Sequence, residues 1–134
     1  MANAVYNKAR EEYLDGLLDW SADDVRVCLV KSGYTFSAAD TSMSDISTND
    51  NGRSAALGSK TVTDGVADAA DTSLTATSAT ACSALVVFKH TGSDATARLI
   101  AYIDTPTAGL PFTPAAGQTV NIAWDNGANK IFKL

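Results

Sequence analysis

Residues 84–103 read ALVVFKHTGSDATARLIAYI, and this stretch decides the fold class. The segments 84–88 and 98–103 are apolar at nearly every position, whereas residues 91–95 between them favour a turn. A strand covered on one face alternates between apolar and polar side chains, so a continuous apolar run indicates burial on both faces. We therefore expect 84–88 and 98–103 to pair as central strands of a two-layer β structure.

Weaker strand signals surround this centre. Residues 24–31, DVRVCLVK, alternate as expected of a core strand with at least one buried face. Residues 53–81 are rich in Ala, Thr, Ser and Asp, which predicts short, lightly packed strands, with Asp64-Gly65 as a turn.

The last sixteen residues predict a β-hairpin. Residues 119–124 alternate, and Asp125-Asn126-Gly127 is a strong turn signal that would return residues 130–134 antiparallel to them. Chain ends fray unless they are held, so an apolar strand that reaches Leu134 predicts an end held in a sheet or against a neighbouring subunit.

Two helices are expected. Tyr6, Ala9, Tyr13, Leu17 and Trp20 recur at spacings of three and four, which predicts an amphipathic helix over residues 1–20 that ends or bends near Gly16. The simpler interpretation is that this stripe packs on the protein's own sheet; the alternative is that it contacts another subunit. Ser37 to Asp40 resembles a capping box and predicts a short two-turn helix that includes Met43 and Ile46. The segments predicted to be loops are 47–52, rich in turn formers, and 105–118, which holds all three prolines.

The length of 134 residues suits one domain with one core. We expect a single domain over 1–134, with an N-terminal helix over 1–20 and a β domain over 24–134. Turn signals separate the strands and no βαβ alternation occurs, so the predicted fold is mainly β, a β-sandwich or jelly-roll-like domain.

Composition excludes several classes of partner. A net charge of −5 provides no basic field for a phosphate backbone, so nucleic acid is not an expected partner. The apolar runs are too short to cross a bilayer, and the N-terminus does not resemble a signal peptide, which predicts synthesis in the cytoplasm and no membrane partner. Cys28 and Cys82 lie far apart in apolar segments, as expected of buried thiols.

Catalytic and metal-binding patterns are weak. In Gly58-Ser59-Lys60-Thr61 a serine separates the glycine from the lysine of a phosphate-binding loop, and a strand pattern follows where that loop needs a helix. His90 is the sole histidine and has no partner at a recognisable spacing. Asp71 and Asp104 could serve as a glycosidase carboxylate pair, but nothing in the sequence marks them as one. Oxygen ligands for calcium could come from Asp45, Asn49, Asp50 and Asn51, but their spacing is not that of an EF-hand. The sequence therefore predicts no enzyme, no cofactor and no metal site.

Four segments carry a resemblance to a known group of proteins: 7–46, 57–77, 84–105 and 120–134. Their most specific parts are YTFSAAD (34–40), SKTVTDGV (59–66) and WDNGANKIFKL (124–134). In order and content they resemble a group of small virion structural proteins of tailed bacteriophages, similar to head decoration or cement proteins. His90 departs from the pattern, which has an acid at that place in the turn.

The resemblance implies a non-enzymatic virion protein that binds the head shell as an oligomer, for which a trimer is one candidate. Its partners would be the major capsid protein or other virion proteins, and its location the capsid surface. The side chains expected to form the interfaces are Tyr6, Tyr13, Leu17, Trp20, Phe132 and Leu134. The alternative is a tail, head-fibre or connector-associated module that is structural or binds a receptor or glycan, with Tyr34, Phe36 and Phe112 available to stack on sugars.

Overall fold

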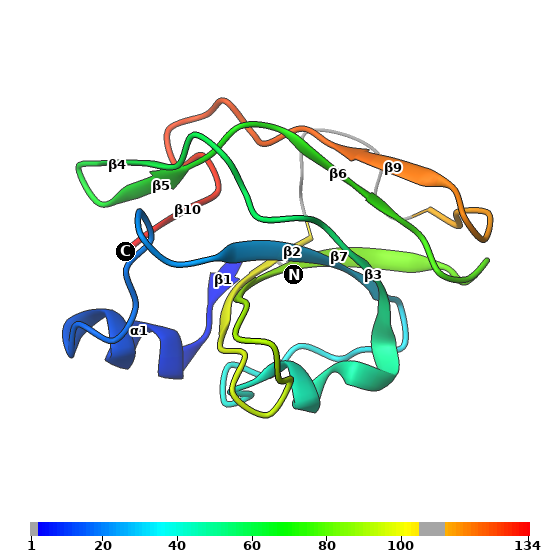
Figure 1. Ribbon diagram of the computed structural model, residues 1–134, viewed down its shortest axis with the longest axis horizontal. Helices are drawn as coiled ribbons and strands as arrows, with labels where there is room; N and C mark the ends of the chain where they lie inside the picture. The colour runs from blue at the N-terminus through cyan, green and yellow to red at the C-terminus, as the bar shows by residue number, and fades with distance from the viewer. Residues whose placement is uncertain (1–2, 105–111) are drawn as a thin grey trace.

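The computed structural model describes residues 3–104 and 112–134, and Figure 1 shows their arrangement. The largest unit is an antiparallel sheet of five strands in the order β1–β8–β7–β2–β3. Its strands are β1 (Ala4–Val5), β2 (Val25–Lys31), β3 (Asp50–Arg53), β7 (Cys82–Lys89) and β8 (Leu99–Ile103). The predicted central pair, 84–88 with 98–103, and the predicted strand over 24–31 are confirmed.

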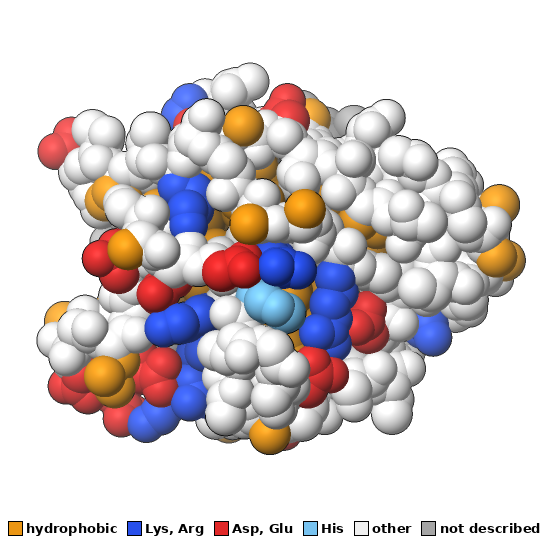
Figure 2. All heavy atoms as spheres, viewed as in Figure 1, with side chains coloured by type: hydrophobic (Ala, Val, Ile, Leu, Met, Phe, Trp, Pro, Cys, Tyr) orange, Lys and Arg blue, Asp and Glu red, His pale blue; other side chains and the backbone are white. Residues whose placement is uncertain are grey.

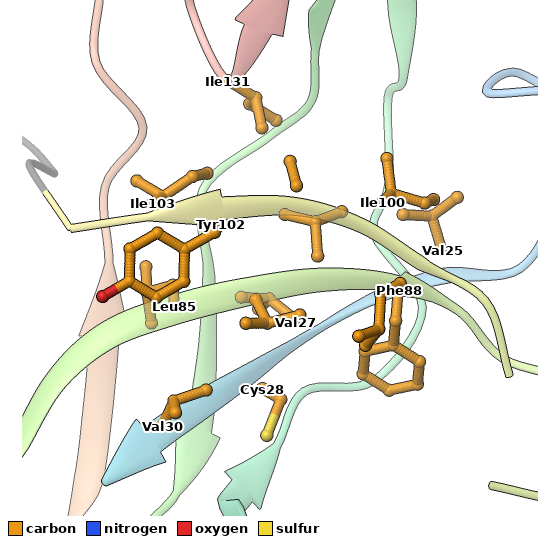
Figure 3. Close-up of a cluster of buried hydrophobic side chains, with 14 of the residues drawn as sticks. Val25, Val27, Cys28, Val30, Leu85, Phe88, Ile100, Tyr102, Ile103 and Ile131 are labelled. Atoms are coloured by element: carbon orange, nitrogen blue, oxygen red, sulfur yellow. The ribbon is translucent and has the colours of Figure 1, made fainter. Parts of the chain in front are cut away.

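Both faces of the five-stranded sheet are covered. Every residue of β8 is buried, as its continuous apolar sequence predicts. Figure 3 shows Ile131 on one side of the sheet, with Cys28 and Phe88 on the other. The buried hydrophobic side chains of the described residues form one cluster around this sheet. Cys28 and Cys82 are buried free thiols within it, as predicted.

Two smaller antiparallel sheets complete the described strands, so the fold is mainly β, as predicted. One has the order β10–β5–β4 and the other pairs β6 with β9. Figure 1 shows both along one side of the five-stranded sheet, with the helix on the other side. The bounds are β4 (Thr61–Thr63), β5 (Val66–Asp68), β6 (Thr72–Thr75), β9 (Thr119–Ile122) and β10 (Phe132–Lys133).

The N-terminal helix is shorter than the predicted span of 1–20. Helix α1 covers Asn7–Leu14, and β1 precedes it. Gly16 ends the helix with a positive φ of 75°, while the Leu17 N–H donates to the Glu12 carbonyl at 2.8 Å and the Gly16 N–H donates to the Tyr13 carbonyl at 3.4 Å. This bonding pattern is a Schellman C-cap, which closes the helix at a glycine. The predicted end near Gly16 is therefore confirmed, but the helix does not resume afterwards.

The predicted two-turn helix is also wrong. The chain instead forms two short 3-10 helices, Met43–Asp45 and Ser47–Asn49. A capping box is present, but it joins Ser42 to Asp45 and not Ser37 to Asp40. The Asp45 carboxylate accepts backbone N–H groups of Thr41 and Ser42, and these bonds hold its pKa below the ordinary value.

The predicted loop over 47–52 contains an edge strand instead. β3 pairs with β2, and Asn51 is fully buried. Its side chain accepts hydrogen bonds from the Ser78 backbone N–H at 2.9 Å and the Thr77 hydroxyl at 3.0 Å, and donates to the Ser78 carbonyl at 3.1 Å. The Asn51 side chain thus satisfies backbone groups of a distant loop from within β3.

The C-terminal hairpin predicted between 119–124 and 130–134 does not form. β9 pairs with β6, and β10 pairs with β5. The Asp125 carboxylate accepts the Gly127 N–H at 3.2 Å, so a turn occurs there, but it directs the chain to a different sheet. The Leu134 N–H donates to the Gly65 carbonyl at 3.0 Å, so the residue directly after β10 is held by the turn of the β4–β5 hairpin, close to the expected end held in a sheet. Of the predicted loop 105–118, residues 105–111 lie outside the described part of the chain.

Candidate docking surface

Four large hydrophobic side chains are exposed among the described residues, and two of them line one cleft. Leu14, Leu17, Val62 and Leu134 are 90%, 61%, 54% and 56% exposed. Val62 and Leu134 line a cleft of about 290 Å³, and Gly16, which lines it too, lies between Leu14 and Leu17 in the chain. We call these four side chains and the cleft the apolar end. Large exposed apolar groups that gather in one place mark interaction surfaces more often than scattered ones do.

Aromatic side chains form the floor of the cleft. The rings of Trp20 and Phe132 meet edge to face, with centroids 5.3 Å apart, and the Tyr13 ring lies 6.2 Å from that of Phe132. The Trp20 indole N–H donates to the Asp68 carbonyl at 3.1 Å. This bond fixes the indole between the segment after α1 and β5, so the cleft has a rigid floor.

The segment between α1 and β2 forms one wall of the cleft and is held by two aspartates. The Asp19 carboxylate accepts the backbone N–H groups of Ser21 and Ala22, at 3.0 and 3.1 Å. The Asp23 carboxylate accepts the Asp19 N–H at 2.8 Å and lies 3.2 Å from the Lys89 ammonium. Side chains that bind backbone N–H groups in this way stabilise a turn. Gly16, Leu18, Asp19 and Trp20 are therefore presented to the cleft by an ordered segment.

The Tyr13 hydroxyl is buried at this cleft and has no hydrogen-bond partner among the described residues. Burial raises the pKa of Tyr13, and the nearby carboxylates of Asp23 and Asp19 raise it further. The phenol is therefore neutral in solution at physiological pH. The wall of the cleft is acidic at Asp19 and apolar elsewhere, apart from this hydroxyl.

The structure brings five of the six expected interface residues to this end. Tyr13, Trp20, Phe132 and Leu134 line the cleft, and Leu17 lies between two lining residues. Trp20 and Phe132 are nevertheless buried, so they support the surface from below, while Leu17 and Leu134 are exposed.

Tyr6 is the exception, because it is fully buried in the protein's own core. Its hydroxyl lies 3.1 Å from that of Tyr34, and its ring packs 5.2 Å from that of Phe36. Such a side chain is not available to a partner. The simpler interpretation of the helical stripe, packing on the protein's own sheet, holds for Tyr6 and Ala9.

Sequence reasoning missed Val62 and Leu14. Val62 is the apolar member of the strand Thr61–Thr63, and the alternation of that strand is a signal that one face carries a hydrophobic side chain. Its exposure depends on β4 being the end strand of its sheet, which local sequence does not reveal. Leu14, the last residue of helix α1, is exposed as well.

The aromatic residues named for glycan stacking are engaged in packing. The Phe36 ring lies 4.9 Å from the Tyr102 ring, and Tyr34 lies 6.1 Å from it. The Tyr34 hydroxyl donates to Asp40 at 2.7 Å, and its pKa is raised to about 12, mainly by burial. Phe112 exchanges two backbone hydrogen bonds with Cys82, at 2.8 and 3.0 Å. Tyr34 and Phe36 therefore form part of a cluster with Tyr102, whereas Phe112 lies on another backbone segment.

Several of the residues considered for catalysis, phosphate binding or metal binding have structural contacts. The Asp71 carboxylate accepts the Trp124 N–H at 3.0 Å, and Asp50 forms an ion pair with Arg53 at 2.7 Å. The Lys60 ammonium donates to the Asp23 carbonyl, and β4 begins immediately after it, as the strand pattern predicts. The described residues contain no group of three or more His, Cys, Asp or Glu side chains placed to hold a metal ion. Figure 2 shows basic and acidic side chains interspersed on one face.

No family model matches the chain, and no curated protein or solved structure matches it either. None of the helices in the described residues has the length and apolar character needed to cross a membrane.

Proposed function

We propose that this chain is a non-enzymatic structural protein of a tailed-phage virion, a decoration or cement protein that binds the head shell through the apolar end. The observation that carries the proposal is an aromatic-floored cleft lined by exposed Val62 and Leu134, with exposed Leu14 and Leu17 on either side of its lining residue Gly16 in the chain. The sequence resemblance supports the same role. In this proposal the partners are the major capsid protein and further copies of the chain, and the location is the capsid surface.

The architecture supports this role in two ways. The ordered cleft floor means that docking requires little rearrangement, which lowers the entropic cost of binding. The Leu134 N–H is hydrogen-bonded to the Gly65 carbonyl in the turn between β4 and β5, so Leu134 is held in place at the apolar end. The two smaller sheets on one side of the five-stranded sheet are compatible with the finer expectation of a β-sandwich, which we retain as a proposal.

The test is co-sedimentation of purified protein with shells that lack it, prepared from the phage that encodes the chain. We expect the double variant Leu17→Ser, Leu134→Ser to bind at least about tenfold more weakly, since it removes two apolar contacts of roughly 1 kcal/mol each or more. Both side chains are exposed, so the fold should survive. Ala95→Ser, an exposed position in the loop between β7 and β8, is the control and should bind as the unmodified chain does.

Two outcomes would contradict the proposal. The unmodified chain would fail to bind any shell, or the double variant would bind as tightly as the Ala95→Ser control. Cryo-electron microscopy of complete particles separates the main alternative. Density on the tail, a fibre or one vertex, in place of the capsid lattice, would favour a tail, head-fibre or connector module.

A further inference from the structure

Strand β4 leaves one edge of the β10–β5–β4 sheet open. No described strand pairs with its outer side, and Thr61, Val62 and Thr63 are all exposed. Figure 1 shows the β4–β5 hairpin projecting at one end of the molecule. Natural sheet edges are usually protected by a very short edge strand, a charge or proline within the strand, a bulge or a covering segment. β4 is short, but it carries no charge and no proline, and its register with β5 is regular.

The outward backbone groups belong to Val62. The Ala67 carbonyl accepts the Ile131 N–H at 3.1 Å, so the backbone of Ala67 points toward β10 and away from β4. Val62 lies opposite Ala67 in the antiparallel register. Opposed residues alternate between hydrogen-bonded and non-hydrogen-bonded pairs, so Val62 belongs to a non-hydrogen-bonded pair. Its N–H and C=O therefore face the open edge, while those of Thr61 and Thr63 pair with β5.

An apolar row runs across this sheet to the same edge. Val62, Ala67 and Phe132 lie opposite one another on adjacent strands and therefore share a face. Phe132 and Ala67 are 7% and 4% exposed, but Val62 is 54% exposed. The row is covered at β10 and β5 and uncovered at β4. A further strand beside β4 would continue it if that strand placed an apolar side chain next to Val62.

The residues that flank β4 indicate which strand would fit beside it. Lys60 precedes the strand and Asp64 follows it, so the segment reads Lys-Thr-Val-Thr-Asp. An antiparallel copy centred on Val62 places Lys60 opposite Asp64 at both ends. The Lys60 ammonium, which donates to the Asp23 carbonyl, has further N–H groups for a carboxylate. The segment is therefore complementary to itself in charge and in apolar pattern.

We propose that a second copy of this chain adds its β4 to β4 across a two-fold axis at Val62. The two valines exchange their outward N–H and C=O groups as one hydrogen-bonded pair. The two sheets then form one six-stranded sheet, with a continuous apolar row through both valines. Strand addition of this kind gains affinity from main-chain hydrogen bonds and specificity from the alternating side chains.

This pairing concerns the purified chain and does not depend on a capsid. A three-residue strand pair is smaller than a standard stable interface, so we expect reversible association with a Kd on the order of 0.1 mM. The two-fold operation produces a dimer and not a ring of three copies.

The test is sedimentation velocity of the full chain over a range of concentrations that extends about tenfold above and below that Kd. The unmodified protein should shift from monomer to dimer. Lys60→Glu places a second carboxylate opposite Asp64, and Asp64→Lys places a second ammonium opposite Lys60, so each variant alone should dimerise at least about tenfold more weakly. An equimolar mixture of the two should regain dimer, because every opposed pair is then of opposite charge. Lys130 already adopts a positive φ of 46°, so lysine is tolerated in the backbone conformation found at Asp64.

A backbone variant supplies the second measurement. Val62→Pro removes the outward N–H and should abolish the dimer, while the hydrogen bonds of Thr61 and Thr63 to β5 remain. Thermal unfolding of each variant checks that the fold is retained. A monomer at every concentration, a trimer, or a mixture that associates no better than its components would overturn the proposal. If the β4 amides were protected from hydrogen exchange only when shells are present, and not in concentrated protein, this edge would pair with a capsid strand instead.

Discussion

The β3 and β4 strands are both end strands of their sheets, yet the protein treats them differently. At β3 the Asn51 side chain is fully buried, and Arg53 forms ion pairs with Asp50 and Asp94 at 2.7 and 2.8 Å. The Arg53 guanidinium also lies 5.3 Å from the centre of the Phe88 ring. At β4 every residue is exposed and the strand itself is uncharged. The comparison shows what a closed edge looks like in this chain, and β4 lacks these features, which supports its proposed role as the edge that pairs with a second copy.

The largest expected effect is at Gly52 of β3. A Cβ there would lie 2.3 Å from the Thr75 carbonyl oxygen, and φ is +120°. Gly52→Ala should lower the free energy of unfolding by about 3 kcal/mol or more, because backbone must move and a strained conformation remains. Denaturant unfolding measures this change.

The matched control is Gly58, which precedes β4 and has open space at the Cβ position. Gly58→Ala should change the free energy of unfolding by less than about 0.5 kcal/mol. Equal losses in the two variants would mean that the β3 edge is no more tightly closed than the region before β4.

The next effect concerns Asn51. Asn51→Leu leaves the Ser78 backbone N–H and carbonyl without their side-chain partner, and should cost about 2–3 kcal/mol in unfolding experiments. On the open edge, Val62→Thr keeps the side-chain shape at an exposed site and should cost less than about 0.5 kcal/mol. A loss at Asn51 as small as that at Val62 would contradict the assignment of a closed edge at β3.

The smallest effect is a pH dependence at the closed edge. The Arg53 hydrogen bonds hold the pKa of Asp94 below its ordinary value. A carboxyl whose folded pKa is depressed stabilises the fold above its unfolded pKa near ~4, and this stabilisation is lost as the pH falls further. Asp94→Asn should therefore be less stable than the unmodified chain at pH 7, with the difference shrinking toward pH 2. The carboxylate is partly exposed, so the effect is modest. A constant difference across this pH range would contradict the linkage.

Local sequence signals predicted the parts of the fold that local chemistry decides. Continuous apolar runs located β7 and β8, and Asp64-Gly65, with φ of 52° and 79°, formed the predicted turn of the β4–β5 hairpin. Strand β3 was missed because Asn51 gains its partners from residues 26 to 31 positions away in the chain. The terminal hairpin was wrong for a related reason, since β9 and β10 find distant partners that outweigh a strong local turn.

For the candidate site, too, the sequence predicted what depends on local periodicity and missed what depends on the three-dimensional arrangement. Periodicity placed Tyr13, Leu17 and Trp20 on one face, and the structure keeps them at one end although the helix stops at Leu14. Tyr6 shares that spacing but faces the protein's own core. The spacing of apolar residues shows that they lie on one face, but it does not show whether the protein itself or a partner covers that face. The position of Val62 at an open sheet edge depends on strand order, which only the three-dimensional arrangement supplies.

The most direct test of the open edge is residue-resolved amide hydrogen exchange by NMR, comparing Val62 with the amides of β3. The purified protein would be measured at low and high concentration, and then with shells. Our account predicts that β3 amides are protected throughout, whereas the Val62 amide exchanges rapidly in dilute protein and becomes protected at least about tenfold as copies associate. A Val62 amide that exchanges at the same rate in dilute protein, in concentrated protein and on shells would contradict the claim that this edge is a docking surface.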